Sequence, residues 1–213
     1  MALEQNTYII NCLYDRFKQQ KQVFLLLGPT SGVGASYCCR EIAAAAVALL
    51  PNLSVVLVDM NIHHPSLSET AGSPAKGWAS WLMRPKAYPL NEAVVPWSQT
   101  GKFDFLPLGD VGDYREAAAQ LPRWPMILDE LKKMYDLILM DVPAFYQGAE
   151  ARVLCRVADD IIVVIEADGS RKLLVHQMVV DLQRADASIL GVVFNKRRLH
   201  IPRWIYKRLF ASS

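Results

Sequence analysis

The sequence predicts an α/β protein with three layers, in which a doubly wound, mainly parallel sheet lies between two layers of helices. Two observations predict this class. Short runs of Val, Ile and Leu recur along the 213 residues and are mostly continuous, which is typical of strands buried on both faces. Segments of helical length separate these runs, and this alternation favours parallel strands joined by helical crossovers.

The first half of the chain begins this alternation. The apolar run Val23–Leu27 is predicted to be a strand, the alanine-rich Ser36–Leu50 a helix, and Ser54–Val58 the next strand. Residues 65–97 are rich in Pro, Gly and Trp and show little periodicity. We expect an ordered loop region there with one short helix near Trp78–Met83, because its aromatic residues favour packing.

The second half continues the pattern. Four further apolar runs are predicted to be strands: Phe103–Leu108, Leu137–Met140, Ile161–Ile165 and Leu190–Phe194. Three segments between or beside them are predicted to be helices: Trp124–Met134, Ala149–Val157 and Arg171–Ala185. Parallel strands end at a common edge, where open α/β sheets bind ligands. Residues that directly follow the strands are therefore the candidates for a site.

The composition is that of a folded globular protein. Apolar residues make up 52% and charged residues 21% of the chain, which excludes disordered and collagen-like classes, and the length suits one domain over residues 1–213. The four cysteines form no C-x-x-C pair, so reduced thiols in a cytosol are expected. The nine-residue apolar run from Ile42 is too short for a membrane span, which needs about 20 residues, and the polar first 21 residues do not resemble a signal peptide.

The stretch VFLLLGPTSGVGASYCC, residues 23–39, has the outline of a phosphate-binding loop. Compared with G-x-x-x-x-G-K-[ST], Gly34 and Ser36 fit, but Pro29 fills the first glycine position and Ala35 the lysine position. Backbone N–H groups and a helix dipole can bind an anion without a side chain. Candidate nucleotide-binding residues are Gly32, Gly34, Ala35 and Ser36. A tight turn that only requires glycine is the alternative.

Asp59 and Asp141 each follow an apolar strand. A carboxylate at this place can serve catalysis or, with Ser36, hold Mg²⁺ if nucleotide binds, and it can equally cap the next helix or turn. His63 and His64 do not predict a metal site, because neighbouring side chains point apart and no cluster of further ligands completes one. No nucleophile-elbow spacing supports a hydrolase triad.

The C-terminal segment, residues 196–213, is basic and aromatic. After Asp186 the chain has six bases and no acid, whereas 17 bases and 21 acids precede that point, a net charge of about −4. This charge split predicts an interaction surface for an anionic partner, with Arg203, Trp204, Lys207 and Arg208 as contact residues. An anionic membrane surface and a solvated last helix are the alternatives.

Several motifs in the same order resemble those of the cytoplasmic ATPase domain of bacterial tyrosine kinases, relatives of the MinD/ParA group. SVVLVDMNIHHPSL resembles the family's second aspartate motif, FDFLPLGD its P-x-G strand, and YDLILMDVP its Walker B motif. ADDIIVVIEADGSRK and ILGVVFNK resemble its last two strands. The resemblance implies a P-loop NTPase-like domain that binds ATP or ADP with Mg²⁺, with Asn195 near the adenine.

The departures from this family fall on its catalytic positions. Ala35 replaces the Walker lysine, Thr30 stands where MinD/ParA relatives have a second lysine, Asn61 replaces the second aspartate, and His63 replaces an arginine. Because phosphoryl transfer depends on neutralising charge at the phosphates, these changes predict impaired catalysis and weak binding of nucleotide.

The resemblance therefore implies a regulatory or scaffolding partner in bacterial exopolysaccharide or capsule synthesis or export. We expect a cytoplasmic protein at the inner membrane, bound to the cytoplasmic part of a polysaccharide co-polymerase-type protein, which could form homo-oligomers and does not bind nucleic acid. One alternative is an active, atypical ATPase or tyrosine kinase of the same fold. Another is a MinD/ParA-like positioning protein on the membrane or nucleoid.

Overall fold

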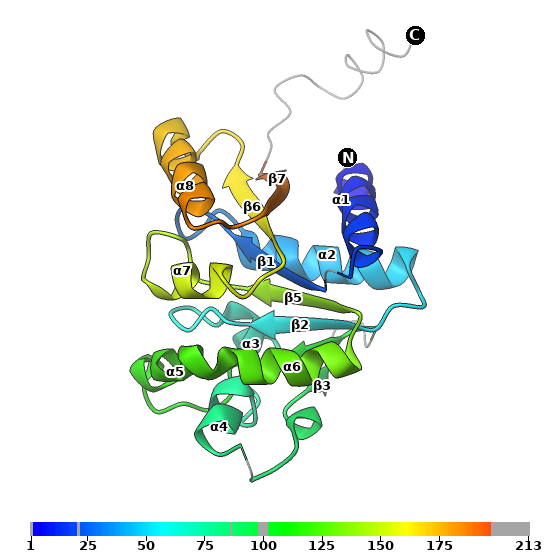
Figure 1. The fold of residues 1–213 in the computed structure, drawn as a ribbon, viewed down its shortest axis with the longest axis vertical. Coiled ribbons are helices and arrows are strands. Elements are labelled where there is room, and N and C mark those ends of the chain that lie inside the picture. The colour runs from blue at the N-terminus through cyan, green and yellow to red at the C-terminus, as the bar shows by residue number, and fades with distance from the viewer. Residues whose placement is uncertain (1, 21, 86, 98–101, 197–213) are drawn as a thin grey trace, which may run out of the picture.

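A computed structural model describes residues 2–20, 22–85, 87–97 and 102–196, with side chains from residue 8 onward. Its centre is a seven-stranded sheet with the order β3-β4-β2-β5-β1-β6-β7 (Figure 1). The strands are β1 Val23–Leu27, β2 Val55–Asp59, β3 Val95–Pro96, β4 Asp104–Leu106, β5 Leu137–Asp141, β6 Asp160–Glu166 and β7 Ile189–Asn195. All neighbouring pairs are parallel except β3 and β4. The predicted fold class is confirmed.

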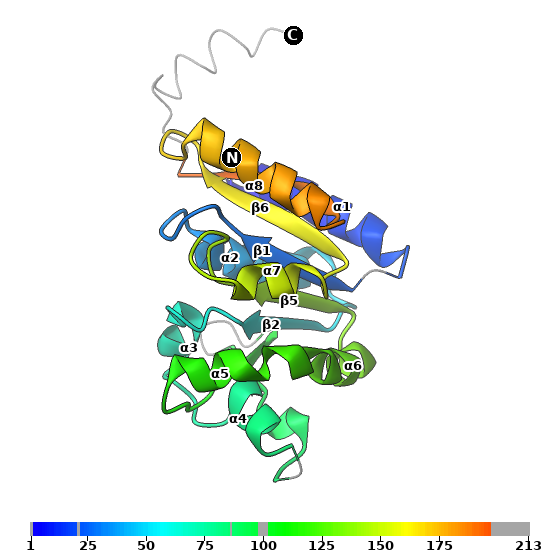
Figure 2. The ribbon, with the colours of Figure 1, turned by 60° about the vertical axis from the view of Figure 1, so that its left-hand side comes forward.

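Helices cover both faces of the sheet (Figure 2). On one face α1 and α2 pack against the core, with Leu67 of α3 in the same cluster. On the other face, buried side chains of α4 to α8 complete a second cluster. The bounds are α1 Ala2–Phe17, α2 Ala35–Leu49, α3 Ser66–Thr70, α4 Trp78–Met83, α5 Tyr114–Gln120, α6 Trp124–Met134, α7 Glu150–Cys155 and α8 Lys172–Arg184. The central strands β1, β2 and β5 are therefore fully buried, as their continuous apolar runs predict.

The prediction of one short helix in residues 65–97 was incomplete. The structure has α4 there as expected, and also α3, a 3₁₀ turn at Leu90–Glu92 and the two-residue β3. It also has α5, which was not predicted from the sequence. Elements this short are fixed by their contacts with the rest of the protein and leave almost no periodic signal. α5 does carry a local signal, since the Asp113 carboxylate accepts a hydrogen bond from Arg115 N at 2.9 Å.

Two glycines in close contact hold α4 against the end of β4. A Cβ on Gly77, the residue before α4, would lie 2.2 Å from the backbone nitrogen of Gly109, and Gly109 itself has φ +86°. The next residue, Trp78, donates its indole N–H to the carbonyl oxygen of Asp59 at 2.7 Å. This contact therefore ties α4 to the end of β2.

We expect Gly77→Ala to lower the free energy of unfolding by about 2–3 kcal/mol, because a rigid backbone must move to admit the methyl group. Urea unfolding followed by circular dichroism measures this loss. Gly191→Ala is the matched control, since its new Cβ would have no neighbouring atom within 4 Å. Equal urea midpoints for Gly77→Ala and Gly191→Ala would show that the contact between Gly77 and Gly109 contributes little to stability.

Within the residues that the structure describes, no helix is long and apolar enough to cross a membrane. The predicted contact residues Arg203, Trp204, Lys207 and Arg208 lie outside the described residues, and of the C-terminal segment only Lys196 is described.

Candidate phosphate-binding site

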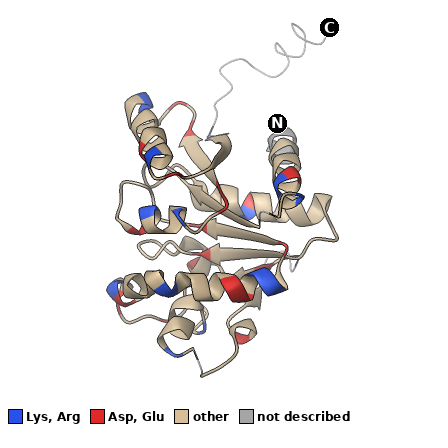
Figure 3. Cartoon of the chain, viewed as in Figure 1, with Lys and Arg blue, Asp and Glu red and all other residues tan. Residues whose placement is uncertain are grey.

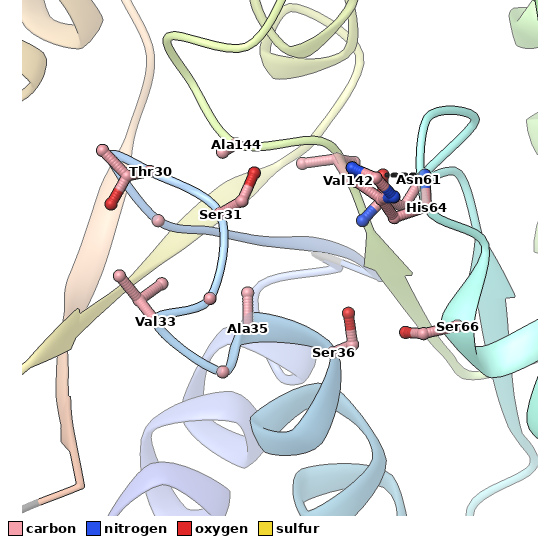
Figure 4. A pocket seen from close by; sticks show the side chains of 13 residues that line it. Thr30, Ser31, Val33, Ala35, Ser36, Asn61, His64, Ser66, Val142 and Ala144 are labelled. Atoms are coloured by element: carbon pink, nitrogen blue, oxygen red, sulfur yellow. Dashed lines mark hydrogen bonds between the residues drawn. The ribbon is translucent and has the colours of Figure 1, made fainter.

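A cavity of about 310 Å³ opens at the carboxyl edge of the sheet, next to the first turn of α2 (Figure 4). Three segments line it: the loop between β1 and α2, the segment after β2 and the start of the segment after β5. The lining residues are Gly28, Thr30, Ser31, Gly32, Val33, Gly34, Ala35, Ser36, Asn61, His64, Ser66, Val142 and Ala144. The cavity thus lies at the position where α/β sheets bind ligands.

The glycines of the β1–α2 loop allow its shape. Gly32 and Gly34 have φ of +82° and +89°, a conformation that side chains with a Cβ adopt only at a cost. The loop is also held from one side by the segment after β5, because Phe145 N donates to Gly28 O at 2.9 Å and Ser31 Oγ donates to the side chain of Gln147 at 3.0 Å. The loop is therefore a fixed turn rather than a loose connection.

An anion is the ligand that suits this turn. The 15-residue α2 begins at Ala35 and has no acidic residue in its first turn, so its N-terminal dipole is not cancelled locally. Hydroxyl groups of Thr30, Ser31 and Ser36 lie in the lining (Figure 4). No Lys or Arg belongs to the lining, and His64 is its one ionisable residue. Among the described residues, Lys and Arg lie on the helices that flank the sheet and on the connections between elements (Figure 3).

Asp59 and Asp141 end the neighbouring strands β2 and β5 and face each other in register. Both are fully buried. The carboxylate of Asp59 accepts hydrogen bonds from Asn61 N at 3.1 Å and from the backbone N and side-chain Oγ of Ser68, each at 2.8 Å. Burial nevertheless raises the pKa of Asp59 to about 6, although these hydrogen bonds act in the opposite direction. Asp59 therefore fixes the chain between β2 and α3.

Asp141 differs from Asp59 in having no such partners. Neither of its carboxylate oxygens has a hydrogen-bond partner among the described residues within ordinary bonding distance. Burial raises the pKa of Asp141 well above its ordinary value, the charge of Asp59 raises it further, and the nearby Ser36 hydroxyl lowers it. Two buried, unpaired oxygens beside a hydroxyl group are an incomplete polar site, because buried carboxylates are normally satisfied.

The structure brings four of the predicted nucleotide-binding residues together in the lining: Gly32, Gly34, Ala35 and Ser36. The fifth, Asn195, is not part of it, and neither are Asp59 and Asp141, which were predicted for catalysis or Mg²⁺. Asn195 lies behind the loop and donates its side-chain N–H to Val33 O at 2.9 Å, and its placement near an adenine stays a prediction.

Sequence reasoning missed three lining residues that follow β2 and β5: Ser66, Val142 and Ala144. It had considered Asn61 only as a departure from the family's motif and His64 only as a metal ligand, and the structure places both in the lining. The rule that identified the glycine loop, position after a strand at the carboxyl edge, could have found them.

His63, next to the cavity, contacts the start of α7. Its Nε2 lies 3.5 Å from Glu150 Oε2, and its ring centroid lies 5.3 Å from that of Tyr114. The part of the chain that the structure describes contains no group of three or more His, Cys, Asp and Glu side chains arranged to hold a metal ion. A Mg²⁺ that arrives with a nucleotide needs fewer protein ligands, because phosphate oxygens and water complete its shell.

Comparison with known proteins gives a family match over most of the chain. The sequence profile of the family described as "Cellulose biosynthesis protein BcsQ" matches residues 22–192. EpsB of Ralstonia solanacearum, assigned as a tyrosine-protein kinase, is 27% identical over 174 residues, which are 80% of this chain and 22% of EpsB. The succinoglycan biosynthesis transport protein ExoP of Rhizobium meliloti is 25% identical over 164 residues, 74% of this chain and 20% of ExoP.

A solved structure agrees with the fold. The kinase domain of the Escherichia coli tyrosine kinase ETK superposes with a TM-score of 0.70 at 18% identity, over 85% of this chain and 71% of that one. At this identity the likeness concerns the fold alone. The chain spans about a fifth of the length of EpsB and ExoP.

Proposed function

The chain belongs to the family of the cellulose biosynthesis protein BcsQ, and from this membership we propose a nucleotide-binding, catalytically impaired partner of a bacterial exopolysaccharide machinery. It acts as a regulator or scaffold in the synthesis or export of the polymer. The observation that carries this proposal is a phosphate-loop cavity whose lining contains backbone and hydroxyl groups but no Lys or Arg. Such a cavity can bind phosphate and lacks the fixed cation on which phosphoryl transfer depends.

Mg²⁺ fits the residues that are present. Ser36 lies in the cavity lining, and the two unpaired carboxylate oxygens of Asp141 are buried beside its hydroxyl group. A serine hydroxyl and a strand-end aspartate are the residue types that hold this ion in P-loop proteins. Ser36 and Asp141 would hold Mg²⁺, which would supply positive charge at the phosphates. The loop N–H groups bind and orient the anion. Asp59 keeps the chain after β2 in place, and Asn61 there offers an amide where a second carboxylate would stand.

The partner and the location are part of the same proposal. The likeness to ExoP, a transport protein of succinoglycan biosynthesis, supports a place beside an inner-membrane protein of polysaccharide export. We propose that the cytoplasmic part of such a co-polymerase-type protein is the partner and that the basic residues Arg203, Lys207 and Arg208 contact it. The polymer to test first is cellulose, because the family carries that name.

Purified protein is expected to hydrolyse Mg-ATP no faster than an Asp141→Ala variant and to leave its own tyrosines unphosphorylated. Phosphate release and mass spectrometry measure the two reactions, and calorimetry on the same sample measures binding. Turnover that disappears in Asp141→Ala would support an active ATPase or kinase instead.

Deletion of the coding sequence in the source bacterium tests the biological role. Loss of the chain is expected to lower the yield of exopolysaccharide, measured by dye binding before and after cellulase treatment. The variant Arg203→Glu, Lys207→Glu, Arg208→Glu is expected to complement poorly and to recover less of the membrane partner than wild type. An unchanged polymer yield in the deletion strain would contradict the role.

A further inference from the structure

Two residues at the end of β7 donate side-chain hydrogen bonds to two successive carbonyl groups of the β1–α2 loop. Lys196 Nζ donates a hydrogen bond to Gly32 O at 2.7 Å, and the side-chain amide of Asn195 donates to Val33 O at 2.9 Å. These two residues are more than 160 positions away from the loop in sequence. The contact is close, because a Cβ on Gly34 would lie 2.1 Å from Asn195 Nδ2.

Lys196 is directed at the loop by an uncommon backbone conformation. Its φ is +53°, in the left-handed region that non-glycine residues rarely occupy. Its ammonium group also lies 3.4 Å from Glu166 Oε2, at the end of β6. Gln20, Ser73 and Asp186 share such a φ, so it is the contact of Lys196 with the loop, together with this conformation, that invites a functional explanation.

The chemistry of the peptide group supplies that explanation. An ammonium ion bound to the Gly32 carbonyl polarises the peptide unit whose N–H belongs to Val33, and the Asn195 amide does the same for the N–H of Gly34. A hydrogen bond to the carbonyl group of a peptide strengthens the hydrogen bond that the N–H group of the same peptide donates. Both N–H groups belong to residues that line the cavity. A cation placed behind the loop can therefore make the front of the loop a stronger anion binder without touching the anion.

We propose that Lys196 is a positioning residue of the phosphate site, which acts through the Gly32–Val33 peptide and partly replaces the lysine absent at position 35. The inference rests on the proposed nucleotide pocket. Because the polarised N–H groups would bind phosphate oxygens, the effect should grow with phosphate charge and be larger for Mg-ADP than for Mg-AMP. Glu166 opposes this effect by offsetting part of the ammonium charge.

The test compares Mg-ADP, Mg-AMP and adenosine by calorimetry. Lys196→Gln keeps a hydrogen-bond donor and removes the charge, and it is expected to raise the Kd for Mg-ADP about three- to tenfold. The Kd for adenosine should stay unchanged, and Lys196→Arg should stay within about twofold of wild type for Mg-ADP. Glu166→Gln should lower the Kd for Mg-ADP, whereas loss of a merely structural contact would not strengthen binding. Lys133→Gln is the matched control, since Lys133 is an exposed lysine paired with Glu130 on α6.

Equal affinity of wild type and Lys196→Gln for Mg-ADP would overturn the inference, as would an equal loss for adenosine. If wild type binds no nucleotide, the proposed pocket is wrong. The NMR resonance of the Val33 amide proton then tests the role of Lys196 separately. Polarisation by the ammonium ion predicts that this NMR resonance moves upfield in ligand-free Lys196→Gln and keeps its place in Lys196→Arg and Lys133→Gln. An unmoved resonance in Lys196→Gln would refute the role of Lys196.

Discussion

Replacing Ala35 with lysine is expected to strengthen the binding of Mg-ATP by about 10- to 150-fold, the value of one charge-assisted hydrogen bond of roughly 1.5–3 kcal/mol. Ala35 is the first residue of α2 and lines the cavity between Val33 and Ser36 (Figure 4). The loop N–H groups would already hold the phosphates, and the new ammonium group would add the missing cation. Calorimetric titration of both proteins with Mg-ATP measures the gain.

Leu49→Lys is the matched control for this gain. Leu49 is the last residue of the same helix, is 46% exposed and is far from the cavity in sequence, so the substitution adds the same charge without a phosphate contact. Its affinity for Mg-ATP should stay within about twofold of wild type, as expected for a distant, exposed charge. If Ala35→Lys and Leu49→Lys behave alike, the β1–α2 loop does not cradle phosphate.

Asp141→Asn is expected to stabilise the ligand-free protein at pH 8 by about 1–3 kcal/mol, the usual cost of a buried polar group without a hydrogen-bond partner. Asp141 and Asp59 are buried in register with each other, and burial raises the pKa of both, that of Asp59 to about 6. A carboxyl group with a raised pKa contributes stability that is present below its unfolded pKa, near 4, and is lost as pH rises through the folded pKa. Removing one of the two charges should therefore help most at high pH and little at pH 4.5.

Urea unfolding of wild type and variant at pH 4.5 and 8, without Mg²⁺, measures this difference. Asp160→Asn should instead lower the free energy of unfolding, because Asp160 is buried with partners. It has an ion pair to Arg16 at 3.3 Å and accepts a short hydrogen bond from Ser188. Mg-ATP should then stabilise wild type more than Asp141→Asn, since only the carboxylate gains a cation. A less stable Asp141→Asn protein at pH 8 would mean that the Asp141 carboxylate has a stabilising partner.

The fold could be predicted from the sequence because its central strands are short, fully buried apolar runs. VFLLL of β1 and LILM of β5 are apolar because they lie in the middle of the sheet, where helices cover both faces. The glycine turn could be predicted too, since Gly32 and Gly34 have positive φ. Residues that form regular elements, or directly follow them, could therefore be predicted from the sequence.

Contacts between distant parts of the chain could not be predicted in this way. Nothing in the sequence around Lys196 indicates that its ammonium group meets Gly32, because the contact depends on how β7 pairs with β6 and β6 with β1. The different hydrogen bonding of Asp59 and Asp141 could not be predicted either. It depends on whether a nearby turn delivers donors, as Ser68 does for Asp59 and no described residue does for Asp141.

The two edges of the sheet differ, and the difference limits how copies of this chain could join. At one edge, β3 has only two residues, and one of them is Pro96, which has no N–H to offer a new strand. At the other, β7 has seven residues, with Val192 44% and Phe194 50% exposed, and β6 is its one neighbour in the described sheet. Among the described strands, the β7 edge therefore offers the longer run of backbone groups to a strand from a second copy. Two such edges joined by a two-fold axis leave no free long edge, so growth would end at a closed pair and not continue into a fibre.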